Sequence, residues 1–163
     1  AKLKGAKVIG IAGGPEKCAV LVNEVGTDAA IDYKNQNIDE QIKIHAPDGI
    51  DIFFDNVGGN ILDLALDNLR DRARVIICGA ISQYSHHDAV EGPSLYLRLA
   101  EKYARMEGFT VMHFEEHYEH GILCLLNQRK HSPTQRITAL NTLALLTRFN
   151  FNLIYHFRLD IRY

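Results

Sequence analysis

The sequence alternates between short apolar runs and stretches with helical spacing, and this alternation restricts the chain to few folds. Five runs rich in β-branched or aromatic residues predict strands, at residues 8–13, 29–33, 50–55, 73–78 and 109–114. Strands that are apolar nearly throughout, with helices between them, predict a parallel sheet covered on both faces. Because such crossovers are right-handed, we expect a doubly wound parallel α/β sheet.

Four helices are expected between these strands. The first opens with Pro15 at its first helical position and ends at Gly26, which suits the left-handed conformation of a helix end. The second spans residues 38–45 and is followed by a Pro-Asp-Gly turn. The last two are expected over residues 60–69 and 95–106, from the spacing of their apolar side chains.

Composition excludes several classes of protein. The chain has 163 residues and a formal net charge of −2, which gives no electrostatic reason for nucleic-acid binding. It contains no run of about 18 uninterrupted apolar residues, so we expect no membrane helix. No secretory signal is visible. The three cysteines, Cys18, Cys78 and Cys124, are few and odd in number, which argues against a disulfide scaffold. We therefore expect a cytoplasmic protein.

The charge is distributed unevenly along the chain. Residues 1–121 contain 19 acidic and 12 basic side chains, whereas residues 122–163 contain one acidic and six basic side chains. Such a break predicts two segments, an α/β domain over 1–121 and a divergent basic and apolar tail over 122–163. Within the tail, residues 137–149 have helical spacing. We expect the tail to be partly helical and packed on an edge of the sheet, or poorly ordered, in preference to lying on a membrane.

In a sheet of this kind, ligands bind beyond the carboxyl ends of the strands. Three of these ends are rich in glycine or small residues, at 13–14, 56–59 and 79–82, so a phosphorylated ligand can approach the backbone closely. After the first strand, no Asp or Glu stands in the position that would hold the ribose 2′-hydroxyls, and Lys17 lies nearby. Both features favour a 2′-phosphate, hence NADP over NAD. Tyr33 offers a hydroxyl to the same phosphate. A solvated Lys17 and a packing Tyr33 would explain these residues equally well.

Five motifs in a fixed order resemble one enzyme family. They are GAKVIGIAGGPEKC, GTDAAIDYK, PDGIDIFFDNVGG, ICGAIS and RMEGFTV, all within residues 1–121. Together they resemble the zinc-independent medium-chain dehydrogenase/reductases, in the branch of the NADP-dependent alkenal double-bond reductases and prostaglandin reductases. The pairing of FDNVGG with ICGAIS is far more specific than a lone glycine motif. The resemblance implies a Rossmann-like domain that binds NADP(H).

The resemblance also implies which residues bind the cofactor. Lys17 and Tyr33 match positions that contact the adenosine 2′-phosphate, and Asn56 matches a residue that lines the cofactor groove. Residues 78–84 match the loop around the nicotinamide ribose, and the strand after them borders the nicotinamide. The full expected set is Gly13, Lys17, Tyr33, Asn56, Cys78, Gly79, Ala80, Ile81, Ser82, Tyr84, Phe109 and Val111. Either Tyr84 or Tyr96 is expected near the substrate carbonyl, so the catalytic residue stays open.

Members of this branch transfer a hydride from NADPH to the β-carbon of an α,β-unsaturated aldehyde or ketone, and dimers are usual among them.

Here AKLKGAK looks like the end of the first helix of the domain, so we expect the first strand and its glycine-rich loop to be missing. After Gly121 the family pattern is lost. We therefore expect a fragment that is inactive alone. The alternatives are a non-catalytic product that associates with an intact enzyme or another partner, and a quinone reductase of the same superfamily.

Two further features carry other expectations. The motif HFEEHYEH places His113, His117 and His120 among three glutamates, and such side chains can bind Zn²⁺ or Ni²⁺. Because the motif straddles the end of an expected strand, helical spacing is not assured, and we expect a solvated polar segment and no metal site. Cys78 ends an apolar strand and is expected to be a small buried side chain.

Overall fold

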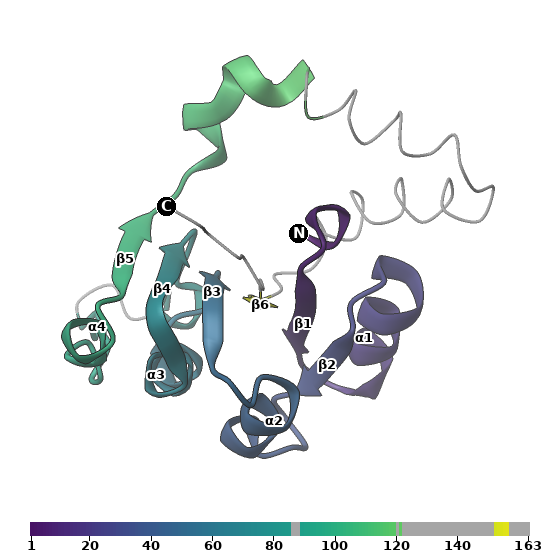
Figure 1. The fold of residues 1–163 in the computed structure, drawn as a ribbon, viewed down its shortest axis with the longest axis horizontal. Helices are drawn as coiled ribbons and strands as arrows, with labels where there is room; N and C mark the ends of the chain where they lie inside the picture. The colour runs from purple at the N-terminus through teal and green to yellow at the C-terminus, as the bar shows by residue number, and fades with distance from the viewer. Residues whose placement is uncertain (86–88, 120, 122–151, 157–163) are drawn as a thin grey trace.

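A six-stranded sheet forms the centre of the computed structural model, which describes residues 1–85, 89–119, 121 and 152–156 (Figure 1). The order across the sheet is β2-β1-β6-β3-β4-β5. The strands are β1 (Lys7–Ala12), β2 (Ala29–Asp32), β3 (Ile50–Asp55), β4 (Leu69–Ile77), β5 (Arg105–Gly108) and β6 (Asn152–His156).

Short helices connect the first five strands. The α-helices are α1 (Pro15–Val20), α2 (Ile38–His45), α3 (Gly59–Asp67) and α4 (Arg98–Glu101). Helix α1 continues as a π-helical turn, η2 (Leu21–Val25), and ends as expected at Gly26, whose φ of 81° is left-handed. The other helical turns are η1 (Lys2–Lys4), η3 (Ile81–Gln83) and η4 (Val111–His117). Helix α2 has a capping side chain, because Asn37 accepts a hydrogen bond from the backbone N–H of Glu40.

The predicted parallel α/β fold is confirmed. Strands β1 and β2 pair in parallel, and so do β3 with β4 and β4 with β5. From β1 the chain builds outward to β2, whereas from β3 it builds in the other direction to β4 and β5. The direction of winding therefore reverses between β1 and β3, which is the switch point of a doubly wound sheet.

Strand β6 lies at this switch point and was not expected from the sequence. It pairs antiparallel with β1 on one side and with β3 on the other, so that Ile154 lies opposite both Ile9 and Phe53. The tail therefore contributes a strand to the centre of the sheet. The helix expected over residues 137–149 lies outside the described residues.

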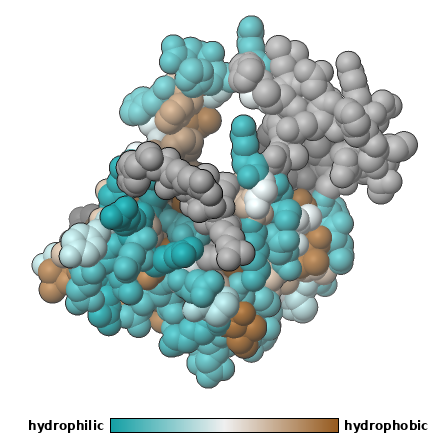
Figure 2. Space-filling view, in the orientation of Figure 1, coloured by the Kyte–Doolittle hydropathy of each residue, from teal (hydrophilic) through white to brown (hydrophobic). Residues whose placement is uncertain are grey.

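The core lies where the sheet meets the helices. Its fully buried side chains come from every layer, and include Ile9, Ile31, Phe53, Leu66 and Val75. In contrast, the face seen in Figure 2 is largely hydrophilic, with hydrophobic residues in separate patches. The alternation of apolar runs in the sequence thus produces a sheet whose apolar side chains are covered by helices.

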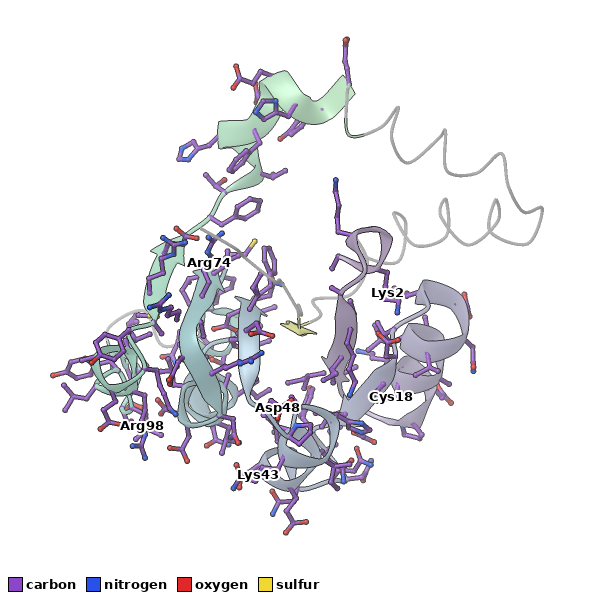
Figure 3. The ribbon with its side chains drawn as sticks, in the orientation of Figure 1. Lys2, Cys18, Lys43, Asp48, Arg74 and Arg98 are labelled. Atoms are coloured by element: carbon purple, nitrogen blue, oxygen red, sulfur yellow. The ribbon has the colours of Figure 1, made fainter. Side chains whose placement is uncertain are left out.

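Charged side chains form ion pairs on the outer side of the helices, where Figure 3 labels Lys43 and Arg98. Arg98 of α4 lies 2.8 Å from Asp67 at the end of α3 and 2.6 Å from Glu101. Lys43 of α2 pairs with Asp39 one turn earlier. Because these pairs are exposed to solvent, each contributes little to stability.

Two predicted elements are wrong. The helix expected over residues 95–106 is reduced to the four residues of α4, because Arg105 already belongs to β5. The strand expected over residues 109–114 is replaced by η4. Strand β5 pairs with β4 only as far as Gly108, opposite Ile77, where β4 ends. Residues beyond Gly108 consequently extend past the end of the neighbouring strand.

One glycine in a turn provides a test of this packing. Gly49 has a φ of +91°, and a Cβ atom there would lie 2.9 Å from the backbone nitrogen of Arg70. Gly5 has a similar φ of +81°, but its Cβ position has no heavy atom within 4 Å among the described residues. We predict that Gly5→Ala lowers the free energy of unfolding by about 1–2 kcal/mol, the cost of a left-handed alanine. We predict that Gly49→Ala lowers it by about 1–3 kcal/mol more, because backbone must move.

Urea unfolding of the two variants and the parent chain measures both losses. Since both glycines have a positive φ, the difference between the two losses reports mainly the contact between Gly49 and Arg70. Equal losses in the two variants would contradict the packing of this turn against the start of β4.

Candidate functional site

The expected cofactor-binding residues follow directly after the parallel strands, at one edge of the sheet. Gly13 follows β1, Tyr33 follows β2, Asn56 follows β3 and Cys78 follows β4. Strands β1 to β5 all run in the same direction, because β1 and β3 are both antiparallel to β6; their carboxyl ends therefore lie at one edge, which we call the carboxyl edge. In a doubly wound sheet, the part of this edge at the switch point is where ligands bind.

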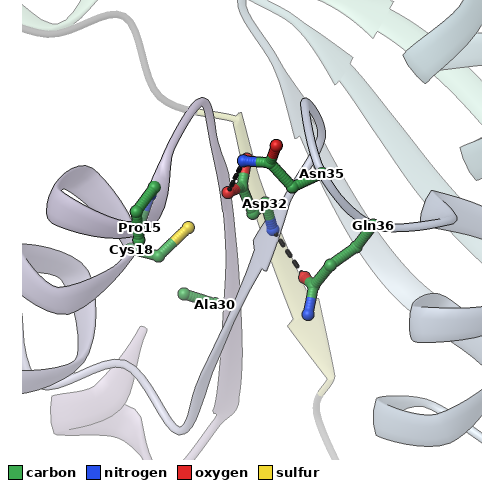
Figure 4. Close-up of a pocket in the computed structure, with 6 residues that line it drawn as sticks. All are labelled: Pro15, Cys18, Ala30, Asp32, Asn35 and Gln36. Carbon is green, nitrogen blue, oxygen red and sulfur yellow. Dashed lines mark hydrogen bonds between the residues drawn. The ribbon is translucent and has the colours of Figure 1, made fainter.

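Asp32, the last residue of β2, joins the loops that follow β1 and β2. Its buried carboxylate accepts hydrogen bonds from the backbone N–H of Gly14 at 2.8 Å and of Lys34 at 3.0 Å. It also accepts one from Nδ2 of Asn35 at 2.7 Å, which Figure 4 shows. The bonds from Asn35, Gly14 and Lys34 lower the pKa of Asp32 below its usual value. Asp32 therefore stays ionised and fixes two loops relative to each other.

Behind these loops lies a pocket that the sequence did not indicate. Figure 4 shows the residues that line it, Pro15, Cys18, Ala30, Asp32, Asn35 and Gln36. It lies between the start of α1 and the loop after β2. The pKa of the Cys18 thiol is raised by burial and by the nearby Asp32 carboxylate, so this thiol is a weak nucleophile at neutral pH.

Tyr33 and Lys34 lie over the backbone of Gly13. A Cβ atom on Gly13 would be 2.8 Å from Cζ and Oη of Tyr33 and 2.9 Å from Cε of Lys34. Any larger residue at position 13 would displace both side chains. Tyr33 is 45% exposed, so its phenol covers the loop and still faces solvent. Lys17, in α1 directly after this loop, is also exposed.

Asp55, the last residue of β3, plays the corresponding part in the other half of the sheet. Its carboxylate is fully buried and accepts hydrogen bonds from the backbone N–H of Val57 at 2.8 Å and of Gly58 at 3.0 Å. Burial raises the pKa of Asp55, and the hydrogen bonds from Gly58 and Val57 oppose this rise. The backbone carbonyl of Asp55 also accepts from Cys78 at 2.8 Å, so β3 and β4 end together.

The loops after β3 and β4 form one connected unit. The backbone N–H of Ile81 donates to the carbonyl of Asn56, and that of Ser82 donates to the carbonyl of Val57, both at 3.1 Å. The hydroxyl of Ser82 donates to the same Val57 oxygen at 2.5 Å. The contact is close, because a Cβ atom on Gly59 would lie 3.1 Å from Oγ of Ser82. The expected residues Asn56 and 78–82 are therefore brought together.

Of the other expected residues, Phe109 is packed against neighbouring rings, whereas Val111 and Cys78 are exposed. Phe109 is half-buried and packs against Phe54 and Phe114, with ring centroids 5.4 and 5.3 Å apart. Its backbone N–H donates to the carbonyl of Ile77, so it lies beside the end of β4. Val111 is 54% exposed at the start of η4, since the expected strand is absent there. Cys78 is exposed instead of buried, because β4 ends one residue before it.

The structure separates the two tyrosines that the sequence left as alternatives. Oη of Tyr84 lies 3.0 Å from the position that a Cβ atom would take on Gly79, at the carboxyl edge. Tyr96 follows Leu95, whose backbone N–H donates to the carboxylate of Asp63 in α3. Tyr84 thus lies at the carboxyl edge, and the residue before Tyr96 is bonded to α3.

The histidine-rich motif forms no cation site within the described residues. His113 and His117 belong to η4, which is a 3₁₀ helix, and His120 lies outside the described part of the chain. Across residues 1–85, 89–119, 121 and 152–156, no group of three His, Cys, Asp or Glu side chains could hold a metal ion. No helix in the same part of the chain is long and apolar enough to cross a membrane.

The groups at the carboxyl edge fit a phosphorylated dinucleotide. Apart from its two chain neighbours, no described residue has a heavy atom within 4 Å of the Cβ position of Gly14, so a ligand can approach this backbone. Three exposed donors, Lys17, Lys34 and the phenol of Tyr33, come from the same two loops and the helix after them.

Asp32, Asp55 and Lys34 were not among the expected residues. The signal for both aspartates is an Asp at the end of an apolar strand, where its side chain can accept from backbone N–H groups two or three residues later.

A family model described as zinc-binding dehydrogenase matches residues 1–127. Among curated proteins, (+)-pulegone reductase of Mentha piperita is 43% identical over 119 residues, which cover 72% of this chain and 34% of that protein. The 2-alkenal reductase (NADP(+)-dependent) of Nicotiana tabacum is 40% identical over 131 residues, 80% of this chain and 38% of that protein. The chain thus spans only about a third of the length of these relatives.

Solved structures agree with the sequence comparisons. CurA from Vibrio vulnificus, in complex with NADPH, aligns with a TM-score of 0.62 and 36% identity. The alignment covers 90% of this chain and 40% of that chain. Quinone oxidoreductase of Escherichia coli, also complexed with NADPH, aligns with a TM-score of 0.55 but only 20% identity, which shows a shared fold alone.

The pKa of Asp32 gives a prediction for the two loops that it joins. An unfolded aspartate titrates near pH ~3.9, and the folded pKa of Asp32 is lower. The parent chain should therefore be more stable than Asp32→Asn at neutral pH, and this advantage should shrink as the pH falls below about 4. Urea unfolding of both proteins from about pH 7 to about pH 3 measures the difference.

Asp48→Asn is the matched control, since Asp48 is an exposed carboxylate in the turn before β3 (Figure 3). A difference between parent and Asp32→Asn that stays constant over this pH range would mean that Asp32 holds no hydrogen bonds specific to its ionised form.

Proposed function

The chain belongs to the zinc-binding dehydrogenase family, in its zinc-independent branch of alkenal and prostaglandin reductases, and we propose that it binds NADP(H) at the carboxyl edge. The observation that carries this proposal is the contact of Tyr33 and Lys34 with Gly13, above the loops that Asp32 fixes. It places a phenol and an ammonium group beside an accessible backbone. A 2′-phosphate needs such donors.

In this proposal the two halves of the edge hold different parts of the cofactor. Lys17, Tyr33 and Lys34 donate to the 2′-phosphate of the adenosine, and Asp32 holds the loops that carry these donors. Asn56 and residues 78–82 hold the nicotinamide ribose. Asp55 fixes the loop after β3, which contains Asn56. NADPH supplies a hydride when bound.

We propose that the whole enzyme reduces the carbon–carbon double bond of an α,β-unsaturated aldehyde or ketone. Supporting this, relatives at 37–43% identity carry names such as 2-alkenal reductase, prostaglandin reductase and curcumin reductase. The quinone reductases align at 15–20% identity and support the fold only. The enal or enone is therefore preferred to a quinone as the substrate.

We also propose that these 163 residues do not turn over such a substrate alone. About two thirds of the length of the curated relatives has no counterpart in them, and residues from that part would have to complete the substrate site. By resemblance to the same branch, the proposal includes a homodimer in the cytoplasm. Residues 1–121 supply the cofactor-binding groups, and residues 122–163 are a divergent segment that contributes β6 to the same sheet.

Binding of NADPH tests the assignment of Lys17. We predict that Lys17→Ala raises the Kd for NADPH at least about tenfold, because a charge-assisted hydrogen bond contributes about 1.5–3 kcal/mol. The Kd for NADH should change less than about twofold, since NADH carries no 2′-phosphate. Titration followed by the fluorescence of the reduced nicotinamide measures both constants.

Lys4→Ala is the matched control, because Lys4 is an exposed lysine in η1, before β1. It should leave both constants unchanged. Equal weakening of NADPH and NADH by Lys17→Ala would contradict a contact with the 2′-phosphate, and no saturable binding of NADPH to the parent chain would refute the proposed site.

Turnover tests the second part of the proposal. We expect the purified chain, mixed with NADPH and a small enone, to consume NADPH no faster than the mixture without protein. Absorbance of the reduced nicotinamide reports the rate. Enone-dependent oxidation of NADPH that disappears after heat denaturation would show that these residues suffice for catalysis.

A further inference from the structure

Strand β6 differs from the rest of the sheet in direction and in origin. It is the only antiparallel strand among those that the structure describes, and it comes from the tail, far along the chain from its neighbours. It pairs with β1 from Lys7 to Ile11 and with β3 from Ile52 to Phe54. Both of its edges are therefore used.

The position of β6 joins the two halves of the sheet. On one side are β1 and β2, and on the other are β3, β4 and β5. Apart from β6, the main contacts between these halves run through α2, which touches β2 and α3. Without a strand in this place, β1 and β3 would each present a row of unpaired backbone N–H and C=O groups, which is an open template for an extended chain.

We propose that β1 and β3 form a strand-acceptor site, in which segment 152–156 binds as a peptide ligand would. The site also accepts the same segment in trans, from a second copy of this sequence. The backbone carries the affinity, because an inserted strand gains a hydrogen-bond ladder on each side. The sequence Asn-Leu-Ile-Tyr-His suits this role, since its centre is apolar and β-branched or aromatic. The register fixes the direction, with Ile154 opposite Ile9 and Phe53.

Proline at the centre of the segment tests its occupancy in the full chain. Ile154→Pro removes a backbone donor and restricts the backbone, so it should release the segment. Hydrogen exchange should become at least about 100-fold faster at the amides of β1 and β3 that face β6. The amides between β4 and β5 should stay protected, which shows that the rest of the sheet is folded. Ile154→Val is the control, because valine keeps the β-branched side chain and the backbone donor.

A synthetic peptide with the sequence of residues 150–158 then tests binding in trans. Added to the Ile154→Pro chain, it should bind saturably and restore the protection of β1 and β3, whereas a scrambled peptide should not. Its affinity for the Ile154→Val chain should be at least about tenfold weaker, because the linked segment competes at high effective concentration.

Each other outcome decides against the proposal. Unchanged protection of β1 and β3 in Ile154→Pro would show that the segment does not fill the site. Loss of protection that the peptide fails to restore, either locally or throughout the sheet, would show that no acceptor site persists without the linked strand. Equal binding of the scrambled peptide would show that only non-specific apolar contact is involved.

Discussion

The backbone pairing at the centre of the sheet is the interaction on which the rest of the structure depends. Strand β6 bonds to β1 on one side and to β3 on the other, and so joins two sets of parallel strands. The chain adds these sets in opposite directions from the centre of the sheet. A dinucleotide needs the loops after β1 and β3 to lie side by side, because it spans the switch point between them. The order of the central strands therefore determines whether a binding edge exists at all.

At that edge, two buried aspartates perform the same structural task in different surroundings. Asp32 and Asp55 each end a strand and each accept hydrogen bonds from backbone N–H groups of the loop that follows. The pKa of Asp32 is lowered because its hydrogen bonds outweigh its burial, whereas the pKa of Asp55 is raised because its burial outweighs its hydrogen bonds. As the pH falls and both carboxylates become protonated, the folded state loses the stability that ionised Asp32 provides. Protonation of Asp55, in contrast, removes the cost of burying its charge.

The sequence predicted the features that depend on local signals. Strand β3 and helix α2 were predicted residue for residue, because apolar runs, a capping asparagine and a following turn mark their ends. Strand β6 and the end of β5 were not, since both depend on which strand lies alongside. The same limit applies to the site. Lys17 and Tyr33 were expected from their types and positions, but the contact of Lys34 with Gly13 depends on how two loops fold together.

The measurement that tests the central claim most directly is an amide NMR titration of the ¹⁵N-labelled chain with NADPH. The account predicts saturable shifts at the carboxyl edge, at Gly13, Tyr33, Gly58 and Gly79, and none at Gly49, which lies in the turn before β3 at the opposite edge. Shifts that centre on Gly49, or no saturable shifts at any of these amides, would contradict the claim that this sheet binds NADP(H) at its carboxyl edge.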